Sequence, residues 1–126
     1  YHPLRPTAHG RAICDWPERV YQWHGEGFDL PSGARLLAET DGSFSNQAYA
    51  YGPSAIGIQF HPEITHAMVA RWSTGDHPRF KARGAQPRYG QIADHIAHGP
   101  RVRAWLDALM SRWVASDLAL TDADRT

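Results

Sequence analysis

The residues His61 and Glu63 stand two positions apart, directly after the apolar segment 55–60. Side chains spaced by two along extended chain point to the same side. A short turn at Pro62 can therefore bring the Glu63 carboxylate to the His61 imidazole. A carboxylate in that position orients the imidazole and stabilises the imidazolium, as in a catalytic triad. The pattern predicts a general base that requires a nucleophile.

The only cysteine of the chain, Cys14, does not have the sequence context of such a nucleophile. Cys14 lies in the sequence Ala-Ile-Cys-Asp-Trp-Pro, which lacks the Gly-x-Cys-x-Gly pattern of a nucleophile elbow. The neighbouring Asp15 would raise the pKa of the thiol rather than lower it. We therefore expect Cys14 to be an idle or buried thiol. A single cysteine also fits a reducing, cytoplasmic compartment.

The sequence Gln-Phe-His-Pro-Glu at residues 59–63 resembles the closing signature of class I (triad) glutamine amidotransferases. Residues 20–31 resemble the His-Gly segment of that family, and residues 46–49 resemble the strand before the histidine strand. The resemblance covers nearly the whole chain and is strongest from residue 20 to residue 63. Within the family it resembles stand-alone amidotransferases that are similar to the glutaminase domain of GMP synthase.

The resemblance implies an α/β fold, namely the carboxy-terminal half of a flavodoxin-like domain with a mixed sheet and flanking helices. In relatives the nucleophilic cysteine lies upstream, in an elbow between a strand and a helix. This chain begins at Tyr1, inside what the family uses as a strand. We therefore expect residues 1–120 to form one domain, the second half of an amidotransferase domain, followed by a polar tail at 121–126.

The implied activity is hydrolysis of the glutamine side-chain amide, with His61 as general base and then general acid, and with Glu63 as its orienter. The resemblance also places His24 and Gly25 beside bound glutamine, where a glycine lets the main chain approach a ligand closely. A plain turn ending a strand is the alternative for that pair. Asn46 and Gln47 could line the same cleft or simply begin a strand. We expect the chain to be inactive alone.

The expected partners are glutamine, the missing amino-terminal half or a second copy of the chain, and a synthetase that uses the ammonia. Two other functions stay open. One is a non-catalytic binding or regulatory module that keeps the fold. The other is a cysteine hydrolase similar to γ-glutamyl hydrolases, with the same roles for His61 and Glu63.

Composition excludes other classes of function. The chain has 13 basic and 13 acidic residues, and this balance argues against nucleic-acid binding. No apolar run approaches the ~20 residues that cross a bilayer. Neither the spacing of His61 and His66 nor that of His95 and His98 completes a metal site, and we expect no metal and no cofactor. A basic loop with Arg79, Lys81, Arg83 and Arg88 is expected to be solvated or to dock a synthetase.

The elements that must position these residues are short. Strands are predicted at residues 1–4, 19–23, 47–51 and 55–60, and residues 34–39 fit a strand or one helical turn. A helix is predicted from His66 to about Trp72, with Thr65 as its cap. A loop is expected at residues 73–86 and a helix at 91–98. Gly99 and Pro100 should interrupt that helix before a final amphipathic one. Its apolar stripe is Val102, Leu106, Leu109, Met110, Trp113 and Val114.

Overall fold

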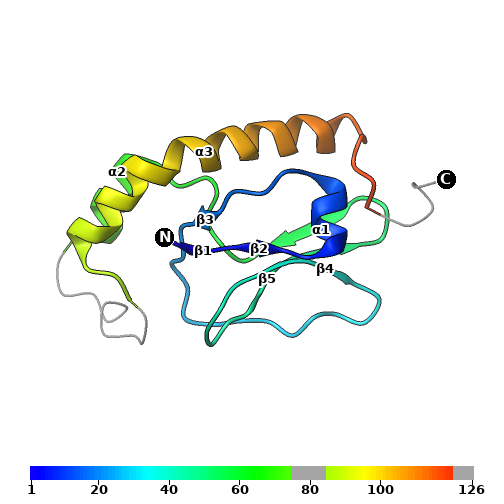
Figure 1. The fold of residues 1–126 in the computed structure, drawn as a ribbon, viewed down its shortest axis with the longest axis horizontal. Helices are drawn as coiled ribbons and strands as arrows, with labels where there is room; N and C mark the ends of the chain where they lie inside the picture. Colours follow the sequence, from blue (N-terminus) through cyan, green and yellow to red (C-terminus); the bar gives the residue numbers. More distant parts are fainter. Residues whose placement is uncertain (75–84, 121–126) are drawn as a thin grey trace.

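A four-stranded antiparallel sheet, with strands in the order β2–β4–β5–β6, and a separate strand pair, β1–β3, form the framework of the chain (Figure 1). The structure is a computed structural model that describes residues 1–74 and 85–120. The strands are β1 (His2–Pro3), β2 (Arg5–Pro6), β3 (Arg19–Val20), β4 (Arg35–Glu39), β5 (Asn46–Tyr51) and β6 (Ala55–Ile58), and the helices are α1 (Ala8–Ile13), α2 (His66–Trp72) and α3 (Arg88–Val114). The predicted α/β class is confirmed, and the strand pairs in the described residues are antiparallel. The predicted tail at 121–126 lies outside the described residues.

The hairpin of β5 and β6 leads the chain into the His-Pro-Glu segment. Its register pairs Tyr51 with Ala55 and Ala48 with Ile58. Gly52 has a φ of 61°, a left-handed conformation that glycine adopts without strain and that closes this short loop. The strand predictions for β5 and β6 are confirmed to within two residues at each end, and residues 34–39, which fitted a strand or a helical turn, form the strand β4.

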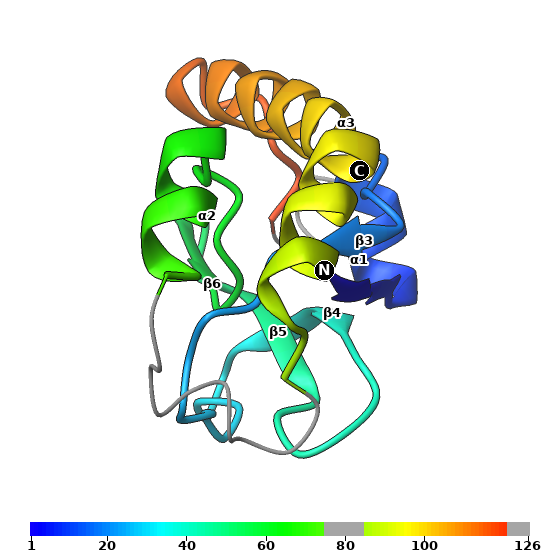
Figure 2. The ribbon, with the colours of Figure 1, turned by 90° about the vertical axis from the view of Figure 1, so that its left-hand side faces the viewer.

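Helix α3 covers one side of the strands, and α2 lies beside its first half (Figures 1 and 2). Val102, Trp105 and Leu109 turn inward from α3 and are at most 5% exposed. The Trp105 ring lies 5.1 Å from that of Trp16 and 5.7 Å from that of Phe60, measured between centroids. Trp16, Phe60 and Trp105 therefore belong to one core, which joins α3 to the residue that directly precedes His61.

The predicted break at Gly99 and Pro100 is wrong, because α3 runs without interruption through both residues. An interior proline removes one helical hydrogen bond and costs about 3 kcal/mol. Gly99 is buried, and the ring of His95 occupies the space that a side chain there would need. Packing on both sides of the proline, through Gln91 before it and Val102 after it, holds the helix together.

Two short elements differ from the prediction. Helix α1 was not predicted; it is capped by Thr7, whose side chain accepts a hydrogen bond from the Gly10 amide. The strand predicted at residues 19–23 forms a ladder only at Arg19–Val20. Beyond it, the carbonyl of Tyr21 accepts a hydrogen bond from the His61 amide at 3.0 Å, so this segment runs beside the His-Pro-Glu segment instead of continuing the ladder.

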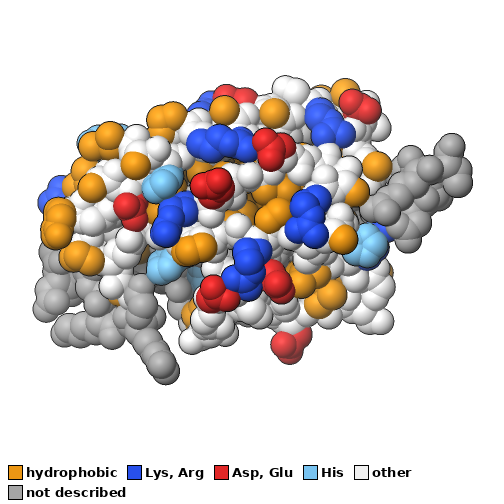
Figure 3. All heavy atoms as spheres, in the orientation of Figure 1, with side chains coloured by type: hydrophobic (Ala, Val, Ile, Leu, Met, Phe, Trp, Pro, Cys, Tyr) orange, Lys and Arg blue, Asp and Glu red, His pale blue; other side chains and the backbone are white. Residues whose placement is uncertain are grey.

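Basic and acidic side chains are intermingled on the face seen in Figure 3. Arg5, for example, lies 2.7 Å from Asp41 and 3.7 Å from Glu39. Most of the expected basic loop lies outside the described residues, and Arg88 belongs to the first turn of α3 instead. Within residues 1–74 and 85–120, no helix is long and apolar enough to cross a membrane, and no three metal-ligating side chains converge.

Candidate functional site

The His-Pro-Glu segment is held between two buried apolar residues. Phe60, 3% exposed, packs on Trp105 of α3, and Ile64, 8% exposed, belongs to the same core. The chain turns at Pro62 and Glu63 between these anchors, and Thr65 then caps α2 by accepting from the Met68 amide. The anchors fix the backbone and leave the two polar side chains at the surface.

Both ring nitrogens of His61 contact acceptor oxygens. Nδ1 lies 2.8 Å from Oε1 of Glu63, and Nε2 lies 3.2 Å from the carbonyl oxygen of Trp23. The His61 side chain is 29% exposed and the Glu63 side chain 52% exposed. The structure thus brings the histidine and the carboxylate together as their spacing predicts. It also turns the second nitrogen toward the segment that carries His24.

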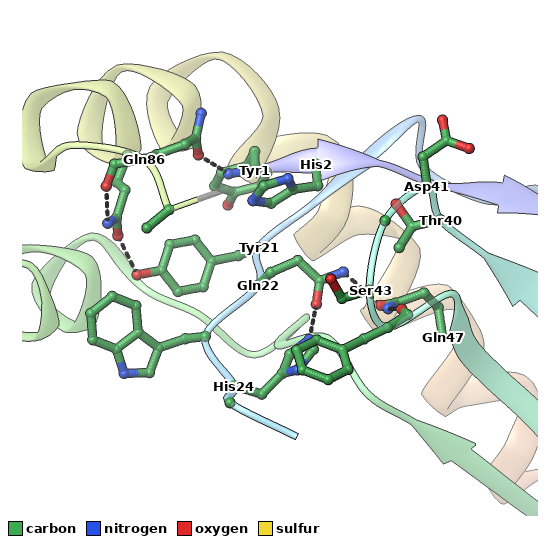
Figure 4. Close-up of a pocket in the computed structure, with 16 residues that line it drawn as sticks. Tyr1, His2, Tyr21, Gln22, His24, Thr40, Asp41, Ser43, Gln47 and Gln86 are labelled. Carbon is green, nitrogen blue, oxygen red and sulfur yellow. Dashed lines mark hydrogen bonds between the residues drawn. The ribbon is translucent and has the colours of Figure 1, made fainter. Parts of the chain in front are cut away.

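A pocket of about 700 Å³ opens beside His24 and Gly25 (Figure 4). Within it, Nε2 of His24 lies 2.5 Å from Oε1 of Gln22, whose amide nitrogen donates to Oε1 of Gln47 at 2.6 Å. Gln47 is fully buried and donates in turn to the carbonyl of Phe44. This relay fixes His24 and Gln22 on one wall of the pocket.

The far wall of the pocket is tied to α3. The Tyr21 hydroxyl donates to Oε1 of Gln91 at 2.6 Å, and the Gln91 amide nitrogen donates to the carbonyl of Gln86 (Figure 4). Burial raises the pKa of Tyr21 to about 12, so this hydroxyl keeps its proton at neutral pH. The segment that presents His24 is therefore anchored to the start of α3.

Two of the solved structures that match cover most of the chain. A glutamine amidotransferase from Methylobacillus flagellatus superposes with a TM-score of 0.74, at 22% identity, over 91% of this chain. A glutamine amidotransferase from Thermotoga maritima superposes with a TM-score of 0.72, at 26% identity, over 90% of this chain. The chain is class I glutamine amidotransferase-like.

Comparison by sequence points to the same family. The amidotransferase-like chain is 38% identical over 53 residues, or 40% of its length, to the glutamine-hydrolysing GMP synthase of Bdellovibrio bacteriovorus. It spans 10% of that protein, and 53% and 49% of the two solved chains. No family model matches it.

The amidotransferase-like chain gathers some of the sequence-predicted residues and separates others. His24, Gly25 and Gln47 line the pocket, whereas Asn46 donates to the carbonyl of Phe28 outside it. His61 and Glu63 do not line the pocket, but the Trp23 carbonyl joins them to its wall.

Two functional features were missed by the sequence analysis. No role was assigned to Trp23 from the sequence, yet its carbonyl contacts the catalytic candidate His61. Gln22 links His24 to the buried Gln47. The available signal for Gln22 was its place in the alternating strand pattern at residues 19–23. The contact made by the Trp23 carbonyl could not be predicted, because a backbone carbonyl is the same in every residue type.

Cys14 ends α1, which lies apart from α2 in both ribbon views (Figures 1 and 2). Burial raises the pKa of its thiol, which favours the unreactive neutral form. Both features agree with the expectation that this thiol is idle.

Proposed function

We propose that the chain supplies the histidine and glutamate of a Cys-His-Glu triad that hydrolyses the side-chain amide of glutamine. The cysteine comes from an amino-terminal half of the domain, outside these 126 residues. The observation that carries the proposal is the 2.8 Å contact between Nδ1 of His61 and Oε1 of Glu63. It leaves Nε2, which faces the Trp23 carbonyl in this chain, as the nitrogen that would transfer the proton.

In this mechanism Nε2 of His61 takes the thiol proton while the sulfur attacks the amide carbon of glutamine. His61 then returns the proton to the amide nitrogen, the C–N bond breaks, and ammonia leaves a thioester. A water molecule, deprotonated by His61, attacks the thioester and releases glutamate, and the proton returns to the sulfur. Glu63 stabilises the imidazolium in each half-reaction.

The pocket beside His24 and Gly25 is the proposed site for the amino-acid end of glutamine. Polar side chains held in a relay, with His24 and Gln22 at its exposed end, suit a ligand that carries an ammonium and a carboxylate group. Exposed Gly25 lets the backbone approach that ligand. Substitution of His24 should therefore raise KM for glutamine more than it lowers kcat.

The proposed partners are the amino-terminal half and a cytoplasmic synthetase that consumes the ammonia. The chain exposes several large apolar side chains, which supports association with another surface. The examples on α3 are Ile96 at 67%, Met110 at 45%, Trp113 at 44% and Val114 at 74% exposed. When the amino-terminal half is absent, we expect copies of the isolated chain to associate with each other instead.

The test is a chimera that joins the amino-terminal half of a class I glutamine amidotransferase, with its elbow cysteine, to this chain. We expect the folded chimera to release glutamate from glutamine, and the 126-residue chain alone to release none. Release should vanish on His61→Ala or when the elbow cysteine becomes serine. A chimera with a cooperative thermal transition that releases no glutamate would support a non-catalytic module instead.

A further inference from the structure

Three aromatic rings form a continuous stack that ends on the imidazole of His61. Tyr21 stacks on Trp23 with centroids 6.5 Å apart, and Trp23 stacks on Trp72 at 6.2 Å. The Trp72 ring then meets the His61 ring edge-to-face, at 5.3 Å and an interplanar angle of 77°. Such separations and angles are those that aromatic pairs prefer.

Both ends of this stack are fixed by the fold. The Tyr21 hydroxyl is hydrogen-bonded to the buried Gln91 of α3. Trp72 is the last residue of α2, between the fully buried Val69 and the buried Ser73, whose hydroxyl donates to the Val69 carbonyl at 2.6 Å. The backbone of Trp72 is therefore held by its helix, and its ring lies against Trp23, both independently of His61.

The contacts to the nitrogens of His61 do not fix the ring by themselves. Glu63 is half exposed, so water competes for its carboxylate. The Trp23 carbonyl and the Glu63 carboxylate are both acceptors, and a neutral imidazole has one N–H to donate. A second restraint is needed to keep the ring from turning about its Cβ–Cγ bond, which would place Cδ2 instead of Nδ1 at Glu63 and move Nε2 away from the Trp23 carbonyl. The Trp72 ring contacts the His61 imidazole, and its position does not depend on the Glu63 carboxylate or on the Trp23 carbonyl.

We propose that Trp72 is a positioning residue for His61: its ring keeps the imidazole in the orientation with Nδ1 on Glu63 and Nε2 toward the pocket wall. The orientation of the imidazole is a property of this chain alone. Its consequence for catalysis rests on the proposed function, since a ring that turns over would move Nε2 away from the sulfur and put a ring carbon in its place.

The experiment is long-range proton–nitrogen NMR of the side chain of His61 in the ¹⁵N-labelled 126-residue chain at pH 8, assigned by loss of its signals in His61→Gln. Trp72→Leu and Trp72→Met remove the aromatic ring, and Trp72→Phe keeps one. Val69→Ala is the matched control, because it loosens the same helix and Val69 has no ring to contact His61. Thermal unfolding of each variant shows that it is folded at the temperature of measurement.

We expect the wild type, Trp72→Phe and Val69→Ala to show one tautomer, with the proton on Nδ1. Trp72→Leu, or Trp72→Met where the leucine variant does not fold, should show nitrogen shifts averaged between the two tautomers, because an imidazole that turns away from Glu63 loses the contact that keeps its proton on Nδ1. The wild type should also show a nuclear Overhauser contact between the His61 ring protons and the Trp72 indole. Unchanged nitrogen shifts in the folded ring-deleted variant, equal averaging in Val69→Ala, or absence of that contact would overturn the proposal. These measurements use no glutamine, so their failure is distinct from absent glutamate release.

Discussion

The carbonyl oxygen of Trp23 lies 3.2 Å from Nε2 of His61, across 38 residues of sequence. This contact joins the His-Pro-Glu segment to the segment that presents His24. It also occupies the nitrogen that the proposed mechanism uses for proton transfer. An incoming thiol must therefore take the place of a backbone carbonyl beside Nε2, and the approach to His61 runs along the Trp23–His24 segment.

Glu63→Gln in the chimera should lower kcat strongly and leave KM for glutamine nearly unchanged. A neutral amide can still contact Nδ1, but it does not stabilise the imidazolium. We expect a fall in kcat of about 10²- to 10⁴-fold. Glu39→Gln is the control, since Glu39 lies on β4 near Arg5 and away from His61. Equal kcat values for wild type and Glu63→Gln would remove Glu63 from the mechanism.

Cys14 should react slowly with iodoacetamide in the folded chain. Burial raises its pKa, so the reactive thiolate is scarcer at pH 7.5 than in an unstructured peptide. Mass spectrometry should show alkylation that becomes fast in concentrated urea. In the chimera, Cys14→Ala should keep glutamate release. Alkylation of the native chain as fast as that of the unfolded chain would contradict this account.

The free energy of unfolding should fall as the pH drops through 6.5, partly because of His95. Burial, and then the neighbouring His66, lower the pKa of His95 from its ordinary value of 6.5. The unfolded chain therefore gains a proton near pH 6.5 that the folded chain resists, and stability is lost toward lower pH. Nδ1 of His95 also lies 2.7 Å from the Tyr1 hydroxyl.

Urea unfolding between pH 5 and 8 checks this dependence. His95→Gln should flatten the pH profile, and His66→Gln should flatten it less. A remaining slope is expected from His2, whose pKa is also lowered by burial. A profile that His95→Gln leaves unchanged would show that the dependence comes from elsewhere.

Gly10→Ala should destabilise the chain by about 1–3 kcal/mol or more. An alanine methyl group there would lie 1.9 Å from the backbone carbonyl oxygen of Leu37, and neither backbone can yield cheaply. Gly90→Ala on α3 is the matched control, since its nearest atom, Cγ of Pro87, is 3.6 Å away. That substitution should stabilise by up to about 1 kcal/mol. Equal unfolding midpoints in urea for the two variants would contradict the packing of α1 on β4.

Local patterns were sufficient for much of this fold. Helix α2 begins at His66 behind its Thr65 cap, because a side-chain cap is a short-range signal. The spacing of His61 and Glu63 also predicted their contact, because two residues around one proline have few ways to meet.

Tertiary contacts decided the rest. Pro100 does not end α3, because buried residues on both sides hold the helix against the core at a cost that local rules do not include. The Trp23 carbonyl and the Trp72 ring reach His61 from other segments, 38 residues before it and 11 residues after it. Neither contact follows from the types of the residues in a local window.

The most direct test of the central claim is a crystal structure of the chimera. The account predicts that the elbow sulfur lies within about 2.6–3.2 Å of Nε2 of His61, or slightly farther in the absence of glutamine, while Nδ1 stays on Glu63. A sulfur that lies beyond any reach of Nε2, or a His61 turned away from Glu63, would contradict the account.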